Sequence, residues 1–355
     1  MNEEIVTQVS KEVFKETKGT SYSRLSKLAN GPKAYQAALA DDSTSSAMAL
    51  GTAVDIKLTE PERFDEEIYV MSVKKPTAEM MVKFVNGLVN NSGNTAIAWT
   101  QSGFKIGIDA VMKKFDKEGG REYHDALLAA GDRQVLDIED LFKVNQIVST
   151  LQNNPFTKKY FIPEDGVDLI FQPCIIWDLA YVSLVEDKMK TIVAKSMLDV
   201  IRVDHRNKII QPVDLKTGGE GFMKSYWRYK RYLQGAMYTQ ATYKATWDKE
   251  EIGEQYEIDN MRFIYADTNL FNPPVIYKMT DDDVHVGTNG KLYRTFGNNS
   301  ELNQFGYIKD NWKTKGYTQL AAELEWHIAN DQWEYSYDVY KKNGEIDINS
   351  FVIKF

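Results

Sequence analysis

The stretch from Thr191 to Tyr243 constrains the fold of this chain more than any other segment. Two runs rich in β-branched residues, 191–201 and 208–217, flank the polar turn 204–207, and this pattern predicts an antiparallel hairpin. We expect one long aromatic and basic helix next, which carries Gln234 and Tyr238. A chain of 355 residues with 43% hydrophobic content is long enough to bury a large core around these elements. The pattern therefore predicts a globular protein of the α/β class.

Two aspartates meet at one end of the expected hairpin. Asp199 closes the first apolar strand and Asp214 lies in the second, so antiparallel pairing brings their carboxylates together. Carboxylate oxygens suit Mg²⁺ or Mn²⁺, which keep coordination positions for water and phosphate oxygens. Lys216 lies two residues after Asp214 and projects from the same strand face. This combination predicts metal-dependent hydrolysis of a phosphodiester, in which the lysine orients the nucleophile and offsets developing charge.

The acidic-x-Lys triplet by itself is a weak signal. Glu16–Lys18, Asp55–Lys57 and Glu186–Lys188 have the same form, and the ordinary interpretation of any one triplet is a solvated ion pair. Only Asp214–Lys216 ends a β-branched strand, follows a second aspartate and precedes a basic helix. The metal-site interpretation rests on that whole combination.

The segment Lys224–Tyr232 is the densest basic and aromatic stretch in the chain. Its cations are candidates to contact DNA phosphates, and its exposed rings are candidates to stack on unpaired bases. Lys195 is a further candidate, although a lysine at a sheet edge is the simpler interpretation. The candidate DNA contacts are Lys195, Lys224, Arg228, Lys230 and Arg231. Helical spacing also places four residues on one side, which indicates core packing: Tyr226, Tyr229, Leu233 and Met237.

The order of these motifs resembles the PD-(D/E)XK nuclease superfamily. Val213–Thr217 after Leu198–Val200, followed by Gln234-Gly-Ala-Met-Tyr238, is similar to the branch with a Gln-x-x-x-Tyr helix. That branch contains RecB-type nuclease domains and RecE-type exonucleases. Three further segments extend the resemblance to about Ser21 through Tyr243: Ser21–Tyr35, Met48–Phe64 and Phe171–Trp177.

The resemblance implies a fold and a set of site residues. The implied fold is an α/β nuclease core, a mixed central sheet flanked by helices, with an N-terminal helical part and a C-terminal extension. We expect these parts at 1–160, 161–280 and 281–355, within one compact domain. The implied catalytic residues are Asp199, Asp214, Lys216, Gln234 and Tyr238. The implied metal ligands are Asp199, Asp214, Asp55 and Leu215, with Gln172 and Gly51 lining the site.

Two positions depart from the RecE-like pattern. Asp55 stands where that group usually has histidine, and Gln172 stands where it usually has glutamate. Aspartate is a competent ligand for Mg²⁺, so Asp55 is expected to take the place of the histidine or to compensate for the neutral Gln172. The alternatives are that Asp55 caps or exposes a helix end and that Gln172 lies outside the site.

Charge and cysteine content restrict the remaining possibilities. A net charge of −8 disfavours attraction of the whole surface to nucleic acid, so any DNA contact must be local. One cysteine, Cys174, excludes an internal disulfide and the four-cysteine iron–sulfur cluster of some RecB-type nucleases. Neither a secretory signal nor an apolar run of membrane-spanning length is present. We expect a cytoplasmic protein without a membrane partner, in the host cytoplasm if it is phage-encoded.

The expected function is that of a Mg²⁺- or Mn²⁺-dependent deoxyribonuclease. By resemblance, it is an exonuclease that processes double-stranded DNA ends in recombination or repair, of a type often encoded by phages. Candidate partners are DNA, a single-strand annealing protein and further copies of the chain. Three alternatives stay open: a structure- or sequence-specific endonuclease, a non-catalytic DNA-binding or assembly module on a degenerate nuclease fold, and a structural phage protein.

Overall fold

The computed structural model describes residues 5–40, 46–247, 255–293 and 312–345. The chain divides into two compact units, one formed by 1–43 with 151–355 and the other by 44–150. This division differs from the three segments expected within one domain. The N-terminal Leu25 and the C-terminal Leu320 share one buried cluster with the sheet residue Ile210, so both chain ends belong to the same unit. Residues 294–311 and 346–355 of the expected C-terminal extension lie outside the described residues.

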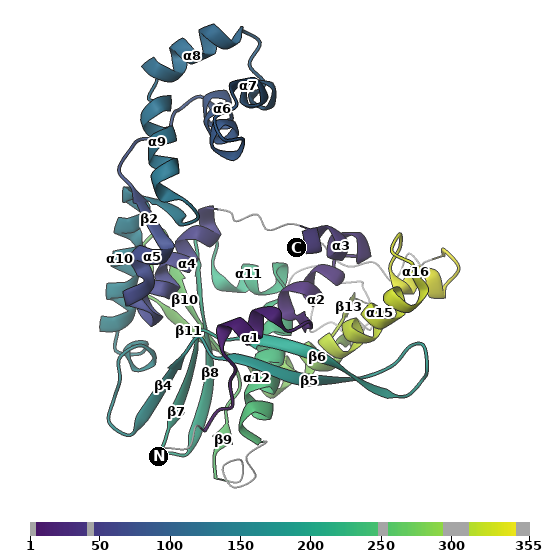
Figure 1. Cartoon of the computed structure of the whole chain (residues 1–355). Coiled ribbons are helices and arrows are strands. Elements are labelled where there is room, and N and C mark those ends of the chain that lie inside the picture. The colour runs from purple at the N-terminus through teal and green to yellow at the C-terminus, as the bar shows by residue number, and fades with distance from the viewer. Residues whose placement is uncertain (1–4, 41–45, 248–254, 294–311, 346–355) are drawn as a thin grey trace, which may run out of the picture. The chain divides into compact units, whose positions relative to one another are not determined.

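The first unit contains a mixed six-stranded sheet, which confirms the predicted α/β class (Figure 1). Its strands run in the order β11-β10-β8-β7-β4, with the short β9 beside β8. β8 pairs antiparallel with β7 and parallel with β10. The strand bounds are β4 Val167–Phe171, β7 Val200–Asp204, β8 Ile209–Gly218, β9 Glu257–Ile258, β10 Arg262–Asp267 and β11 Val275–Lys278.

A second sheet of three strands has the order β1-β6-β5, with β1 at Thr20–Ser21, β5 at Cys174–Val182 and β6 at Met189–Met197. The chain leaves the six-stranded sheet after β4, forms the β5–β6 ribbon and returns in β7. Both crossings lie side by side, because Gln172 N donates to Asp199 O (3.0 Å) and Leu198 N donates to Pro173 O (3.3 Å). The first strand of the predicted hairpin is therefore interrupted at Leu198 and Asp199.

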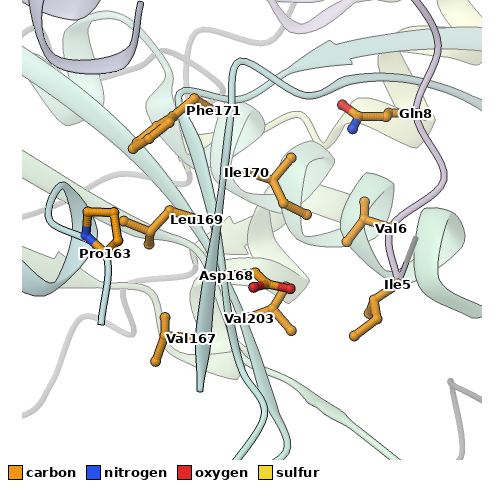
Figure 2. A pocket seen from close by; sticks show the side chains of 10 residues that line it. All are labelled: Ile5, Val6, Gln8, Pro163, Val167, Asp168, Leu169, Ile170, Phe171 and Val203. Carbon is orange, nitrogen blue, oxygen red and sulfur yellow. The ribbon is translucent and has the colours of Figure 1, made fainter. Parts of the chain in front are cut away.

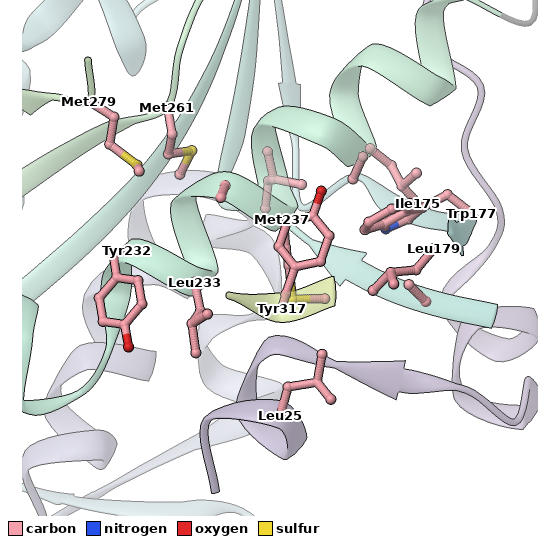
Figure 3. Packing of buried hydrophobic residues seen from close by; sticks show 14 of the residues in the cluster. Leu25, Ile175, Trp177, Leu179, Tyr232, Leu233, Met237, Met261, Met279 and Tyr317 are labelled. Carbon is pink, nitrogen blue, oxygen red and sulfur yellow. The ribbon is translucent and has the colours of Figure 1, made fainter. Parts of the chain in front are cut away.

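Helix α12 (Arg231–Trp247) lies in the centre of the main core (Figure 3). Leu233 and Met237 are fully buried in a cluster with Leu179 of β5 and Tyr317 of α15. Gly287 of α14 allows close contact with α12, because a Cβ there would overlap the carbonyl oxygen of Tyr232. The other helices of this unit are α1 Lys11–Glu16, α2 Tyr22–Leu28, α3 Pro32–Ala40, η2 Lys158–Tyr160, α11 Phe222–Arg228, α14 Asp281–Asn289, α15 Tyr317–Asn330 and α16 Tyr337–Lys341. A short ribbon joins β12 Lys291–Tyr293 to β13 Trp312–Thr314.

The single long helix expected after the hairpin is wrong, because the structure has two helices there, α11 and α12. The chain turns between them at Tyr229 and Lys230, and Lys230 has a left-handed φ of +53°. Of the four residues expected on a core-facing side, Tyr229 is 51% exposed, whereas Tyr226, Leu233 and Met237 are buried. The turn rotates Tyr229 out of the apolar stripe that helical spacing predicted.

The second unit is mainly helical and has its own core, which includes Met81, Phe84, Val111 and Phe115. Its parallel strands β2 (Ile68–Met71) and β3 (Gln134–Asp137) pair with each other. Its helices are α4 Ser46–Thr59, η1 Pro61–Arg63, α5 Phe64–Glu67, α6 Glu79–Asn90, α7 Thr95–Ser102, α8 Ile108–Lys117, α9 Gly120–Ala130 and most of α10 Ile138–Asn153, whose residues 151–153 belong to the first unit. Across the described parts of both units, no helix has the length and apolar character needed to cross a membrane.

Candidate active site

Strands β7 and β8 form the hairpin that the sequence predicts, and its pairing sets the position of two aspartates. Val200 lies opposite Val213, so Asp199 and Asp214 follow at the same end of the hairpin. The main-chain N–H of Leu215 donates a 2.6 Å hydrogen bond to Asp199 Oδ2. The Leu215 N–H thus bonds to a side chain and not to the main chain of β7, because β7 begins only at Val200. The interrupted strand thereby leaves the Asp199 side chain beside β8.

Asp214 is 2% exposed and has a partner at each carboxylate oxygen. Gln234 Nε2 of α12 donates a 2.9 Å hydrogen bond to Oδ1. Lys216 Nζ forms an ion pair with Oδ2. Asp214 and Lys216 are two residues apart in β8, so their side chains project from the same face of the strand. The helix and the strand together hold this carboxylate in one orientation.

The two carboxylates influence each other electrostatically. Burial and the negative charge of Asp214 raise the pKa of Asp199 above its usual range. The Lys216 charge, the Leu215 N–H and the Gln172 amide act in the opposite direction without cancelling the rise. A half-buried and a buried carboxylate in mutual repulsion form a site that a divalent cation would stabilise.

Gln172 lies against Asp199, at the crossing between β4 and β5. Its Nε2 is 3.5 Å from Asp199 Oδ1, and its main-chain N–H donates to the Asp199 carbonyl oxygen. Gln172 has a φ of +49°, a conformation that is unfavourable for a residue with a side chain. Gln172 therefore lies beside Asp199, and its part in the site stays a prediction.

Two tyrosines complete the surroundings of Asp214. Burial and the Asp214 charge raise the pKa of Tyr238 well above its usual range, although the Gln234 amide lowers it. Tyr22 of α2 donates a 2.5 Å hydrogen bond to the Tyr229 carbonyl oxygen. Burial raises the Tyr22 pKa; the Arg231 charge lowers it and the Asp214 charge raises it. Both phenols therefore stay protonated and can donate hydrogen bonds.

Tyr22 is not among the site residues that the sequence predicts. The one available signal was its place in the Ser21–Tyr35 segment, which resembles the opening helix of the nuclease branch. Its hydrogen bond joins residues that are 207 positions apart, and no local pattern encodes such a contact.

The cations expected to contact DNA have different surroundings. Lys224 and Arg228 both pair with Glu220 at 3.2 Å, and they stay exposed on α11. Lys230 Nζ donates to Asn30 Oδ1. The Arg231 guanidinium lies 5.4 Å from the centre of the Tyr229 ring.

Lys195 differs from the edge lysine that the sequence suggested. Its strand β6 lies between β1 and β5, so β6 is an inner strand. Lys195 Nζ donates a 2.8 Å hydrogen bond to the Thr17 carbonyl oxygen and lies 4.6 Å from the Phe14 ring centre. Lys195 thus connects the N-terminal segment to the sheet, and its expected contact with DNA stays a prediction.

Gly51 and Asp55 belong to the second unit, where both lie on α4. Asp55 is half-buried, and its carbonyl oxygen accepts a hydrogen bond from Thr59 Oγ1. The parts that Gly51 and Asp55 take in a metal site stay predictions.

The oxygens around Asp199 and Asp214 suit a magnesium site. No group of three or more His, Cys, Asp or Glu residues that could hold a metal occurs within the described residues. Mg²⁺ needs fewer protein ligands, because it is usually held by one or two carboxylates plus water and substrate phosphates. Leu215 can contribute only its carbonyl oxygen. In a strand the N–H and C=O of one residue point to the same side, so this oxygen faces the side on which Asp199 lies.

A cavity of about 440 Å³ lies along β4, between that strand and the N-terminal segment (Figure 2). Its lining is mainly apolar and includes Val6, Ile170 and Phe171. The single carboxylate in its lining, Asp168, pairs with His205 at 2.8 Å, and neither Lys nor Arg lines it. This cavity is therefore unsuited to a phosphate, unlike the surroundings of Lys216.

Comparisons with known proteins find structural likeness but no sequence match. No family model matches the sequence, and no curated protein matches it. A crystal structure of a "Putative exonuclease" from Eubacterium rectale is similar with a TM-score of 0.40 and 12% sequence identity. The match covers 79% of this chain and 80% of that chain. A likeness at this level assigns neither a family nor a reaction, so functional inference rests on the geometry of the site.

Proposed function

We propose that this protein is a metal-dependent nuclease that hydrolyses phosphodiester bonds of DNA. One observation carries the proposal: two carboxylates, the half-buried Asp199 and the buried Asp214, lie at the end of one hairpin with the Lys216 ammonium against the second. A structural ion pair needs one carboxylate for each cation. A second carboxylate beside a buried one raises the electrostatic cost unless a further cation binds.

Each residue of the site has a distinct role in the proposed reaction. Asp199 and Asp214, with the Leu215 carbonyl, would hold Mg²⁺ or Mn²⁺. When bound, such an ion polarises the scissile phosphate and lowers the pKa of a bound water. Lys216 orients the attacking water and offsets negative charge that develops on the phosphate oxygens. Gln234 fixes the orientation of Asp214 through its 2.9 Å hydrogen bond.

Tyr238 and Gln172 would act on the substrate side of the site. A protonated Tyr238 can donate a hydrogen bond to a phosphate oxygen, because its pKa is far above neutral. The Gln172 amide contributes an uncharged oxygen where the nuclease branch usually has a carboxylate. Asp55, with its additional negative charge, is proposed to compensate for that neutral residue.

The proposed substrate is the end of double-stranded DNA, processed exonucleolytically for recombination or repair. Support comes from the order of motifs shared with the RecE-like group, from Ser21 to the Gln-x-x-x-Tyr helix. The exposed Lys224 and Arg228 on α11 are proposed to contact the DNA backbone. We propose a cytoplasmic location, an annealing protein as a partner and self-assembly on the same resemblance.

A non-catalytic DNA-binding module is the second candidate. The observation that favours it is the neutral Gln172, which leaves two acidic residues at the centre of the site. Such a module would bind DNA and leave it intact at every metal concentration.

The decisive experiment incubates linear and closed circular double-stranded DNA with the protein and Mg²⁺, with and without a chelator. The Lys216→Ala variant runs alongside Lys188→Ala, which removes the lysine of another acidic-x-Lys triplet, in an exposed turn. Metal-dependent loss of linear DNA alone, abolished only by Lys216→Ala, supports an exonuclease. Cutting of the circle indicates an endonuclease. Survival of bound DNA with both Mg²⁺ and Mn²⁺ contradicts the catalytic proposal.

A further inference from the structure

Arg231 differs from the other cations that the sequence marks as DNA contacts. Lys224 and Arg228 pair with Glu220, and Lys195 and Lys230 donate to oxygen atoms of the protein. Arg231 forms neither an ion pair nor a hydrogen bond with any residue that the structure describes. Its Nε atom is buried and lacks a partner within the same set of residues.

Arg231 lies on the helix that also carries the partner of Asp214. Arg231 is the first residue of α12 and lies three residues before Gln234, so both side chains share one face of the helix. Gln234 donates to Asp214 from that face. Arg231 therefore lies about one helical turn from the residue that fixes the catalytic carboxylate.

The backbone beneath Arg231 is held rigidly. The turn before α12 is fixed by the hydrogen bond from Tyr22 to the Tyr229 carbonyl oxygen and by the bond from Lys230 to Asn30. The Tyr229 ring lies 5.4 Å from the Arg231 guanidinium, which favours a cation in that place. These contacts define the location of the charge and leave its Nη donors for another group, whereas the buried Nε does not reach the surface.

A half-buried guanidinium without a counter-ion is energetically unfavourable, since burial removes water without supplying an acceptor. Arginine presents a planar fork of donors that matches two oxygens of one phosphate. An anion with two free oxygens on one atom would accept hydrogen bonds from this fork. The proposed nuclease site nearby indicates that this anion is a phosphate of the DNA substrate.

We propose that Arg231 binds the non-bridging oxygens of one DNA backbone phosphate and thereby sets the position of the DNA strand relative to Asp199 and Asp214. This inference rests on the proposed function, because it names the substrate group that the same site holds. Arg231 is a positioning residue, and its role requires both the positive charge and the planar geometry of the guanidinium. Lysine in its place keeps the charge and loses the fork.

The test measures binding separately from cleavage. Affinity for a fluorescent duplex is determined in chelator for the wild type, Arg231→Ala, Arg231→Lys and the control Arg121→Ala. Arg121 is a matched control, because it also lies 5.4 Å from a ring centre, that of Phe115, but pairs with Asp116. We expect affinity to fall about 10- to 100-fold in Arg231→Ala, with a smaller fall in Arg231→Lys and no change in the control. Thermal unfolding of each variant tests whether it is folded. If Arg231→Ala does not fold, the comparison of Arg231→Lys with the wild type tests the inference.

The second arm moves a single methylphosphonate along the duplex, which removes one phosphate charge at a time. One position should weaken wild-type binding by a similar factor and leave Arg231→Ala unaffected. Unchanged affinity of Arg231→Ala, or the same interference pattern in both proteins, overturns the inference even if the wild type cuts DNA. Arg231-dependent interference without any cutting supports the inference and contradicts the catalytic proposal. Absence of both binding and cutting overturns both.

Discussion

The side-chain amide of Gln234 donates a 2.9 Å hydrogen bond to the buried carboxylate of Asp214. This bond joins the central helix of the core to the strand that carries the proposed active site. Among the described residues, this carboxylate also forms an ion pair with the Lys216 ammonium. The catalytic geometry thus depends on the packing of α12 as well as on the hairpin.

Replacement of Gln234 by alanine should lower the rate of DNA cleavage about 10- to 100-fold, as is typical when the residue that orients a metal ligand is lost. The Asp214 carboxylate would lose its fixed orientation while its charge and the Lys216 pair remain. Single-turnover cleavage with Mg²⁺ measures the effect. Gln240→Ala, one and a half turns further along the same helix and half exposed, is the matched control and should behave as the wild type. Equal rates in both variants would contradict the proposed role.

Replacement of Gln172 by glutamate should make the site more dependent on metal. A third carboxylate beside Asp199 and Asp214 increases repulsion, so the melting temperature should fall in chelator. Mg²⁺ or Mn²⁺ should then raise it by more than in the wild type, because an ion that binds only the folded state stabilises it. Gln240→Glu introduces the same charge away from the site. A metal-induced shift no larger than that of the wild type would show that no ion binds beside residue 172.

Asp204 should make the hairpin sensitive to acid. Burial raises the pKa of Asp204. Hydrogen bonds from Asn207 and the Arg202 guanidinium lower it by more, so that the net pKa is about 2. Because the folded-state pKa lies below the unfolded value, the stabilisation is present at neutral pH and is lost as pH falls from about 4 towards 2. Asp204→Asn should therefore destabilise the protein at pH 7, by about 3 kcal/mol for a broken buried pair. Melting temperatures from pH 7 to pH 2 measure this, and the gap between variant and wild type should close in acid. A gap that stays constant would exclude the ion pair as its cause.

Lys195→Ala should reduce stability without affecting DNA affinity. The variant loses the hydrogen bond to Thr17 and the contact with the Phe14 ring, at a cost of about 1 kcal/mol for the hydrogen bond. Thermal unfolding and duplex binding, measured on the same preparation, separate the two effects. Lys188→Ala, in an exposed turn, controls for loss of one positive charge. Weaker DNA binding in Lys195→Ala alone would restore the sequence-based interpretation.

The sequence by itself determined the hairpin and the residues at its end. The β-branched run in 208–217 and the turn 204–207 predict the pairing of β7 with β8, so Asp199 and Asp214 come together for local reasons. The spacing of Asp214 and Lys216 likewise fixes a shared strand face. Gln234 and the buried side of α12 follow from helical periodicity. Such features depend on residues close in sequence, and local patterns encode them.

Only the tertiary structure decided which polar residues are free to act. Lys195, Lys230 and Arg231 are all cations that the sequence marks as candidate DNA contacts. In the structure, however, Lys195 donates to Thr17 and Lys230 donates to Asn30, and both partners are distant along the chain. The break at Lys230 and the approach of Tyr22 to Tyr229 arise in the same way, from packing of the N-terminal helices. Whether a charged side chain is free to bind a ligand depends on the groups that folding places beside it. Those neighbours come from distant segments of the chain, and no local sequence pattern encodes them.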